Sequence, residues 1–266
     1  MSTIVTTATL RALKQQGEKI ACLTSYDSSF TRLIEDAGVE VILVGDSLGM
    51  VVQGQDSTLP VTLDDMCYHA ACVARAGHTA LRIVDMPFMS YADTRQALES
   101  AARLMREGGA HLVKLEGGQI VADTVRALTA HGIPVCAHLG LIPQSVNQLG
   151  GYRVQGRGEA AAQQLLDDAR LLEDAGASAV VLECVPTALA KEITAAISIP
   201  TIGIGAGPYC DGQVLVLYDL LGIVSGKRPK FTREFLAGAD GIPQALQAYV
   251  AAVKGGSFPA PEHSFD

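Results

Sequence analysis

Polar side chains follow short apolar runs at several points in this sequence. Asp27, Asp46 and Asp85 end three such runs, His138 follows Val-Cys-Ala, and Glu183 follows Ala-Val-Val-Leu. In parallel α/β folds, the carboxyl ends of the strands form the rim that carries the active site. The pattern therefore predicts a catalytic rim. The alternative for any single residue is a helix cap or a local ion pair.

Three of the acidic residues have the composition of a metal site. Asp46, Asp85 and Glu116 would lie on consecutive strands, and neighbouring strands are only about 4.8 Å apart. Clustered carboxylates raise one another's pKa unless a cation compensates them. Oxygen ligands favour a hard ion, so we expect Mg²⁺, with Mn²⁺ as the second choice. Because Mg²⁺ keeps several waters, at least one of the three acids should bind through water.

Lys114 and Glu116 are two residues apart, so a strand would place both on the same face. Lys114 could pair with a substrate carboxylate, act as the Schiff-base lysine of an aldolase, or form an ion pair with Glu116. The local sequence does not distinguish these three roles of Lys114.

Two further residues have candidate roles in proton transfer or substrate binding. Glu183 ends an apolar strand, a setting that suits a general base, although a buried glutamate held by backbone amides is the alternative. His138 could orient substrate or an acidic ligand, or serve a structural role. Gly203, Gly205 and Gly207 form a G-x-G-x-G run that suits a phosphate site or the close approach of a flat ligand.

The elements that carry these residues alternate along the chain. Short runs rich in Val, Ile and Leu occur at 20–27, 41–47, 80–88, 112–117, 134–140, 179–185, 200–207 and 214–223. Stretches with helical periodicity include 94–107, with Thr94 as its expected N-cap, and also 159–175 and 186–197. This alternation predicts a single (β/α)8 barrel over 1–266, with an open doubly wound sheet as the alternative. The long connections at 49–63 and 140–158 should be functional loops.

Composition narrows the class of protein. The chain has 266 residues, 48% of them hydrophobic and only 5% aromatic, which suits a parallel sheet buried on both faces. Its net charge of −8 argues against a nucleic-acid partner, and no apolar run is long enough to span a membrane. The N-terminal residues lack the apolar centre of a secretory signal, and the six cysteines form no CxxC pair. We therefore expect reduced thiols in a cytoplasmic protein.

Longer motifs cover nearly the whole chain: VILVGDSLGMVVQGQDSTLPVTLDDMCYH (41–69), DMPFMSY (85–91), VKLEGG (113–118), PVCAHLGLIPQSVNQLGGYRVQGR (134–157), LECVP (182–186), IGIGAG with DGQVLV (202–216), PKF (229–231) and PEHSF (261–265). Together these motifs resemble the ketopantoate hydroxymethyltransferase family, also called the 3-methyl-2-oxobutanoate hydroxymethyltransferases. One departure is Tyr218, where the family pattern leads us to expect histidine.

The resemblance implies a barrel of the phosphoenolpyruvate/pyruvate-like group, a homo-oligomer that is typically a decamer, and a step towards pantothenate and coenzyme A. The implied substrates are 3-methyl-2-oxobutanoate and 5,10-methylenetetrahydrofolate, and the implied products are 2-dehydropantoate and tetrahydrofolate. Carried over by motif, Asp46, Asp85 and Glu116 correspond to a site for one Mg²⁺ per subunit. Ser47 and Lys114, with the two aspartates, correspond to 2-oxoacid contacts. Glu183 corresponds to the proton acceptor.

Three other functions compete with this one. The nearest is a Mg²⁺-dependent carbon–carbon lyase or mutase of the isocitrate lyase/PEP mutase type acting on a 2-oxoacid, although no KKCGH segment is present. The second is a Schiff-base aldolase that uses Lys114. The third is a non-catalytic barrel that binds a 2-oxoacid.

Overall fold

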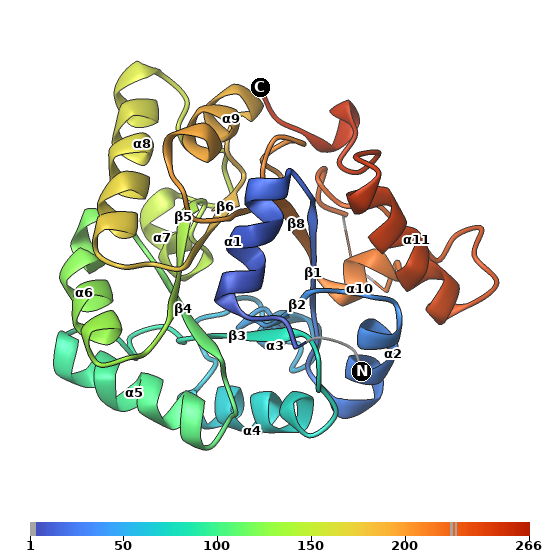
Figure 1. The fold of residues 1–266 in the computed structure, drawn as a ribbon, viewed down its shortest axis with the longest axis horizontal. Helices are drawn as coiled ribbons and strands as arrows, with labels where there is room; N and C mark the ends of the chain where they lie inside the picture. The colour runs from blue at the N-terminus through green and yellow to red at the C-terminus, as the bar shows by residue number, and fades with distance from the viewer. Residues whose placement is uncertain (1–3, 224–225, 227) are drawn as a thin grey trace.

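Parallel strands close into a barrel, as the alternating pattern predicts (Figure 1). The computed structural model describes residues 4–223, 226 and 228–266. The strands pair in chain order and β8 closes on β1. Their bounds are β1 Ile20–Thr24, β2 Val41–Val44, β3 Leu81–Asp85, β4 Leu112–Glu116, β5 Val135–Gly140, β6 Ala179–Glu183, β7 Thr201–Ile204 and β8 Gly212–Leu215.

Helices surround the barrel, because each strand exposes an outward apolar face that must be covered (Figure 1). Their bounds are α1 Thr7–Gln16, α2 Ser28–Asp36, α3 Leu48–Val51, α4 Leu63–Ala74, α5 Thr94–Arg106, α6 Ala122–Ala130, α7 Val146–Leu149, α8 Glu159–Asp174, α9 Thr187–Ala196, α10 Leu217–Leu220 and α11 Ile242–Lys254, with short 3-10 turns at Gln119–Val121, Pro143–Ser145 and Pro261–His263. None of the helices in the described ranges is long and apolar enough to cross a membrane.

Alternation along the strands separates two cores. In β4, Val113 and Leu115 point outward into the core beneath the helices, whereas Leu112 belongs to the core inside the barrel. Lys114 and Glu116 have the same parity as Leu112, so they continue that inward column towards the carboxyl end. The inward column of this strand is therefore apolar at its amino end and charged at its carboxyl end.

Helix α1 lies across the amino-terminal end of the barrel (Figure 1). Leu10 is buried among the inward side chains at that end. Lys14 donates hydrogen bonds to the carbonyls of Thr194 and Ile199 and pairs with Asp211 at 2.9 Å. These contacts fix α1 as the floor of the barrel and leave the carboxyl-terminal rim for ligands.

Two predicted boundaries are wrong. The cap of α5 is Asp93 and not Thr94, because the Asp93 carboxylate accepts from Gln96 N at 2.8 Å. The predicted eighth strand at 214–223 is a strand only up to Leu215, and it begins earlier, at Gly212. A side chain at Gly212 would lie 2.6 Å from the Ile20 carbonyl, so glycine permits this strand pairing.

The second half of that run is helix α10. Leu217 and Leu220 are fully buried there, and Thr24 Oγ1 accepts the first free amide, from Leu217 N, at 2.9 Å. An apolar run does not distinguish a buried strand from a buried helix, which explains the incorrect boundary.

Candidate active site

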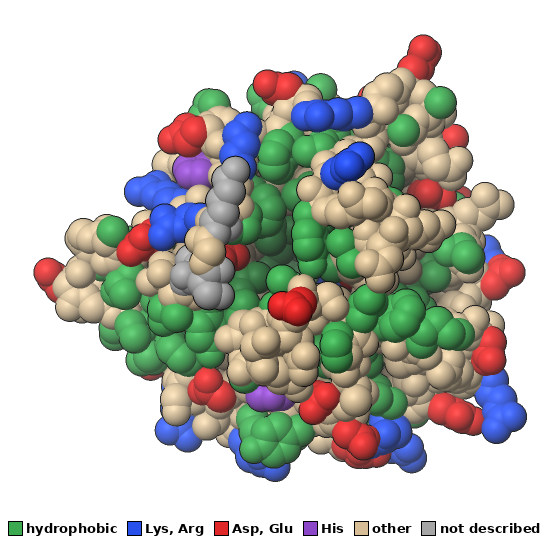
Figure 2. Space-filling model, turned by 180° about the vertical axis from the view of Figure 1, so that it is seen from behind, with side chains coloured by type: hydrophobic (Ala, Val, Ile, Leu, Met, Phe, Trp, Pro, Cys, Tyr) green, Lys and Arg blue, Asp and Glu red, His purple; other side chains and the backbone are tan. Residues whose placement is uncertain are grey.

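A cavity of about 590 Å³ opens at the carboxyl-terminal end of the barrel. The back view shows it as a hollow with hydrophobic walls (Figure 2). The residues predicted to bind metal or substrate or to act as base all line it: Asp46, Ser47, Asp85, Lys114, Glu116, His138 and Glu183. The structure therefore brings together groups that are up to 137 positions apart in the chain.

Strand register creates the pairs at the base of the cavity. Asp85 on β3 is the register partner of Lys114 on β4, and Glu116 on β4 is the partner of His138 on β5. Register partners in a parallel sheet point to the same side, so each pair projects into the barrel together. One acid–base pair thus follows the next around the rim.

The Lys114 ammonium is held among carboxylates. Its Nζ lies 3.1 Å from Asp85 Oδ1, and Asp46 N donates to Asp85 Oδ2 at 3.0 Å. Burial lowers the pKa of Lys114, but the negative charges of Asp85, Glu116 and Asp46 outweigh burial and raise it overall. The side chain is therefore protonated, whereas a Schiff-base nucleophile must be a free amine. This setting disfavours the aldolase hypothesis.

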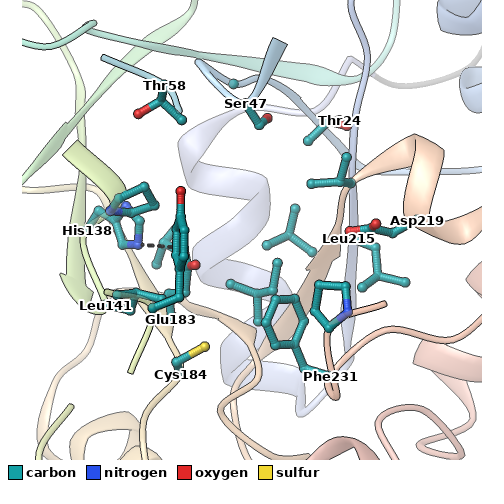
Figure 3. A pocket seen from close by; sticks show the side chains of 18 of the residues that line it. Thr24, Ser47, Thr58, His138, Leu141, Glu183, Cys184, Leu215, Asp219 and Phe231 are labelled. Atoms are coloured by element: carbon teal, nitrogen blue, oxygen red, sulfur yellow. Dashed lines mark ion pairs between the residues drawn. The ribbon is translucent and has the colours of Figure 1, made fainter. Parts of the chain in front are cut away.

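His138 connects Lys114 to two glutamates. Its Nδ1 lies 3.1 Å from Lys114 Nζ and 3.4 Å from Glu116 Oε1, and its Nε2 lies 3.2 Å from Glu183 Oε2 (Figure 3). Burial and Lys114 lower the pKa of His138, but Glu116 and Glu183 raise it overall. The imidazole therefore lies between the predicted metal ligand and the predicted base.

Glu183 ends β6 and reaches the cavity with a side chain that is 15% exposed. The sequence predicts apolar surroundings, but the structure adds His138 beside the carboxylate. Cys184, the next residue, adopts a positive φ of 47°, which is uncommon for a residue with a side chain. Leu141 N and Cys184 N are held by the carbonyls of Glu183 and Ile204 respectively. These bonds fix the sharp turn that follows the carboxylate.

Gln144 is a site residue that no sequence motif indicated. Its side-chain amide donates to Asp46 Oδ2 at 2.8 Å and to the Met86 carbonyl at 2.9 Å. Its backbone N donates to Glu116 Oε2 at 3.0 Å, and Tyr91 donates to its Oε1 at 2.5 Å. Gln144 thus bridges two predicted metal ligands. Its position within the long connection 140–158 was the signal available in the sequence.

Ser47 presents a hydroxyl to the cavity from the start of α3 (Figure 3). The Tyr26 hydroxyl lies 2.9 Å from Ser47 Oγ. Tyr26 stacks on Tyr218, with ring centroids 6.0 Å apart. This contact links the residue that departs from the family pattern to the wall of the site.

Two other rim candidates have structural explanations. Asp27 caps α2, because its carboxylate accepts from Ser29 N at 2.7 Å and Phe30 N at 3.0 Å, so its nomination as a rim acid is wrong. The glycine run packs against the protein's own side chains. An added Cβ at Gly205 would lie 3.1 Å from both Phe231 and Phe265.

The donor set at the base of the cavity fits a hard divalent cation. Burial, together with the nearby Asp85 and Glu116 charges, raises the pKa of Asp46 well above its usual range. Asp85 Oδ1 is buried, and within the described residues it faces the Lys114 ammonium at 3.1 Å without a well-aligned hydrogen bond. The raised pKa of Asp46 indicates that one lysine does not balance the three carboxylates.

The carboxylates of Asp46, Asp85 and Glu116 are not arranged so that all three could bind one metal ion directly. Within residues 4–223, 226 and 228–266, no three His, Cys, Asp or Glu side chains are grouped as metal ligands. A site with one or two carboxylates, completed by water or substrate oxygens, is the usual arrangement for Mg²⁺.

A family model and curated relatives of this chain indicate the same family. The model of the ketopantoate hydroxymethyltransferase family matches residues 4–261. A relative named 3-methyl-2-oxobutanoate hydroxymethyltransferase, from Nitrosococcus oceani, is 60% identical over 261 residues, which cover 98% of this chain and 99% of the relative.

Solved structures share the fold at low identity. A putative phosphonomutase from Burkholderia cenocepacia superposes with a TM-score of 0.65 at 18% identity, covering 82% of this chain and 95% of that one. A 2,3-dimethylmalate lyase, described as a PEP mutase/isocitrate lyase superfamily member, gives a TM-score of 0.59 at 18% identity, covering 83% and 84%.

Proposed function

Because the chain belongs to the ketopantoate hydroxymethyltransferase family, we propose that it transfers a hydroxymethyl group from 5,10-methylenetetrahydrofolate to 3-methyl-2-oxobutanoate. The products are 2-dehydropantoate and tetrahydrofolate, in the synthesis of pantothenate. The observation that carries this proposal is the cluster at the base of one cavity, where Glu183, His138 and the Asp85–Lys114 pair face the same space.

One Mg²⁺ per subunit completes the proposed site. Asp46, Asp85 and Glu116 would hold it, with at least one of them acting through water. The bound ion would supply Lewis-acid polarisation of the keto group and charge for the enolate. Gln144 supports the site, because its hydrogen bonds to Asp46 and Glu116 set where those two carboxylates point.

The carboxylate of the ketoacid adds a further negative charge at the base of the cavity. Lys114 is the buried cation available there, and it is protonated, so it binds the substrate carboxylate or the enolate oxygen. The Ser47 hydroxyl offers a further hydrogen bond. The substrate's reacting carbon would then lie on the Glu183 side of the cavity.

Glu183 removes the proton from C3 of the ketoacid and holds it, and His138, whose Nε2 lies 3.2 Å from Glu183 Oε2, would orient the carboxylate. The electron pair left on C3 forms a new carbon–carbon bond to the methylene carbon of the donor. Both bonds between that carbon and the two folate nitrogens break, and water supplies the hydroxyl oxygen. The two released nitrogens take up the proton from Glu183 and the proton left by the water, which yields tetrahydrofolate.

Proton exchange at C3 tests this assignment without the second substrate. The wild-type chain should exchange deuterium at C3 of 3-methyl-2-oxobutanoate when Mg²⁺ is present. Glu183→Gln should lose this exchange by about 100-fold or more while keeping ketoacid binding. Glu192→Gln, at an exposed position on α9, is the matched control and should exchange normally. Normal exchange in Glu183→Gln would remove Glu183 from the role of base.

A Mg²⁺-dependent lyase or mutase acting on a 2-oxoacid is the second candidate, and the shared barrel of the solved relatives is the observation in its favour. Such an enzyme would cleave or rearrange its own 2-oxoacid and would not exchange the C3 proton of 3-methyl-2-oxobutanoate. The same assay therefore separates the two functions.

We also propose that the chain works as a homo-oligomer, a decamer by family resemblance, in the cytoplasm. Large apolar side chains at Tyr68, Met89 and Ile120 are 57% exposed or more, which supports burial against further copies. All six cysteines are unpaired, which suits a reducing compartment. Analytical ultracentrifugation of the purified chain would measure the assembly.

A further inference from the structure

The cavity has a second half that the ketoacid chemistry leaves unused. Leu215, Asp219 and Phe231 lie across the cavity from His138 and Glu183 (Figure 3). A volume of 590 Å³ is within the range of roughly 300–1,000 Å³ that holds a drug-sized ligand, which is much larger than a small branched ketoacid. This half of the cavity has apolar walls and a carboxylate among them, and Arg228 and Lys230, close to Phe231 in the chain, also line the cavity.

Asp219 is an unpartnered acid in that wall. Only 8% of the residue is exposed, and no described side chain or backbone group donates a hydrogen bond to its carboxylate. Its side chain points from α10 into the cavity (Figure 3). Burial raises the pKa of Asp219 to about 6, even though the charge of Arg228 acts to lower it. Because the carboxylate lines the cavity, a ligand there can supply the hydrogen-bond donors that the described residues do not.

The backbone holds this carboxylate in place. The first amide of α10, at Leu217, donates a hydrogen bond to Thr24 Oγ1. Tyr218, the residue that precedes Asp219, stacks on the buried Tyr26. Phe231 packs against Gly205 on the adjoining wall. The carboxylate therefore stands at a fixed position beside aromatic and aliphatic surfaces.

The chemistry that fits is a flat ring with two adjacent N–H donors. Such an edge can pair with both oxygens of one carboxylate, while apolar side chains cover the ring faces. The one-carbon donor of the proposed reaction has a ring of this kind, because the 2-amino-4-oxopyrimidine edge of its pterin presents an amino group beside a ring N–H.

We propose that Asp219 is the recognition carboxylate for the pterin edge of 5,10-methylenetetrahydrofolate, with Leu215 and Phe231 against the ring. The assignment rests on the proposed function, since it takes the donor's identity from there. Asp219 binds and orients the donor and takes no part in the proton removal by Glu183.

Asp219→Asn tests the assignment, because the amide replaces one acceptor by a donor that faces the ring's own N–H groups. The KM for methylenetetrahydrofolate should rise at least about tenfold. Deuterium exchange at C3 with the ketoacid alone should change by less than about twofold, since additivity holds for separate sites. Asp240→Asn, an exposed aspartate, is the matched control and should keep both values.

A donor analogue provides a measurement that a structural role would not affect. Tetrahydrofolate in which a methyl group replaces the 2-amino group should bind the wild-type chain at least about tenfold more weakly than tetrahydrofolate. The same analogue should lose little affinity in Asp219→Asn, because the partner is already gone.

Equal binding of both folates by the wild-type chain, or an unchanged donor KM in the variant, would overturn the assignment. If Asp219→Asn does not fold, the difference in affinity of the wild-type chain for the two folates still tests whether Asp219 recognises the pterin edge. Wild-type protein that shows no C3 exchange and no hydroxymethyl transfer would instead refute the proposed function, so the two failures are distinguishable.

Discussion

Replacing Asp219 by Asn should change how stability depends on pH. The pKa of Asp219 rises from 3.8 to about 6 on folding, so the folded state holds this proton more tightly than the unfolded state. The stabilisation is complete below pH 3.8 and is lost as the pH rises through 6. At about 1.4 kcal/mol per pH unit, the ionised carboxylate destabilises the fold by about 3 kcal/mol above pH 7, an order-of-magnitude value.

Asparagine has no proton to lose at this position, so the variant should escape the penalty. Between pH 5 and pH 7.5, the difference in unfolding free energy between variant and wild type should increase in favour of the variant by about 1.4 kcal/mol. Urea unfolding monitored by circular dichroism at both pH values measures this difference in unfolding free energy. Asp240→Asn should show no such change. Parallel pH curves for wild type and Asp219→Asn would refute the idea that the folded chain buries an unpaired carboxylate.

Three further substitutions probe other parts of the molecule. Asp85→Ala should raise the Mg²⁺ concentration needed for C3 exchange by about tenfold or more, because it removes a proposed ligand and the counter-ion of Lys114; an unchanged requirement would count against Asp85. Gln144→Leu should weaken Mg²⁺ binding by about 10- to 100-fold in the same titration, whereas Gln148→Leu, exposed on α7, should not; equal titrations would show that the bridge is dispensable. Leu10→Ala should lower the unfolding free energy by about 2–5 kcal/mol in urea, and a loss below about 1 kcal/mol would mean that α1 contributes little to the core.

The sequence predicts the barrel and most of its rim for physical reasons. Strands buried on both faces read as short apolar runs, and the first polar residue after each run marks the carboxyl end. This reasoning located Asp85, Lys114 and Glu183 correctly within one cavity. It failed for Asp27, because a strand-end acid and a helix cap have the same local pattern.

Residues whose role depends on distant contacts were not predictable. Gln144 carries no charge and matches no catalytic spacing, and its partner Asp46 is 98 positions away in the chain. Asp219 was assigned to the eighth strand, where it had no obvious role. Only the turn from β8 into α10 places its carboxylate in the cavity wall.

The closure of the barrel floor by α1 has a kinetic consequence. Traffic to the Lys114 end of the cavity must come from the rim, past the wall formed by Leu215 and Phe231. A folate seated against that wall would obstruct a ketoacid arriving afterwards. Steady-state turnover should then follow a compulsory sequence in which the ketoacid enters first and the reduced folate departs before 2-dehydropantoate escapes.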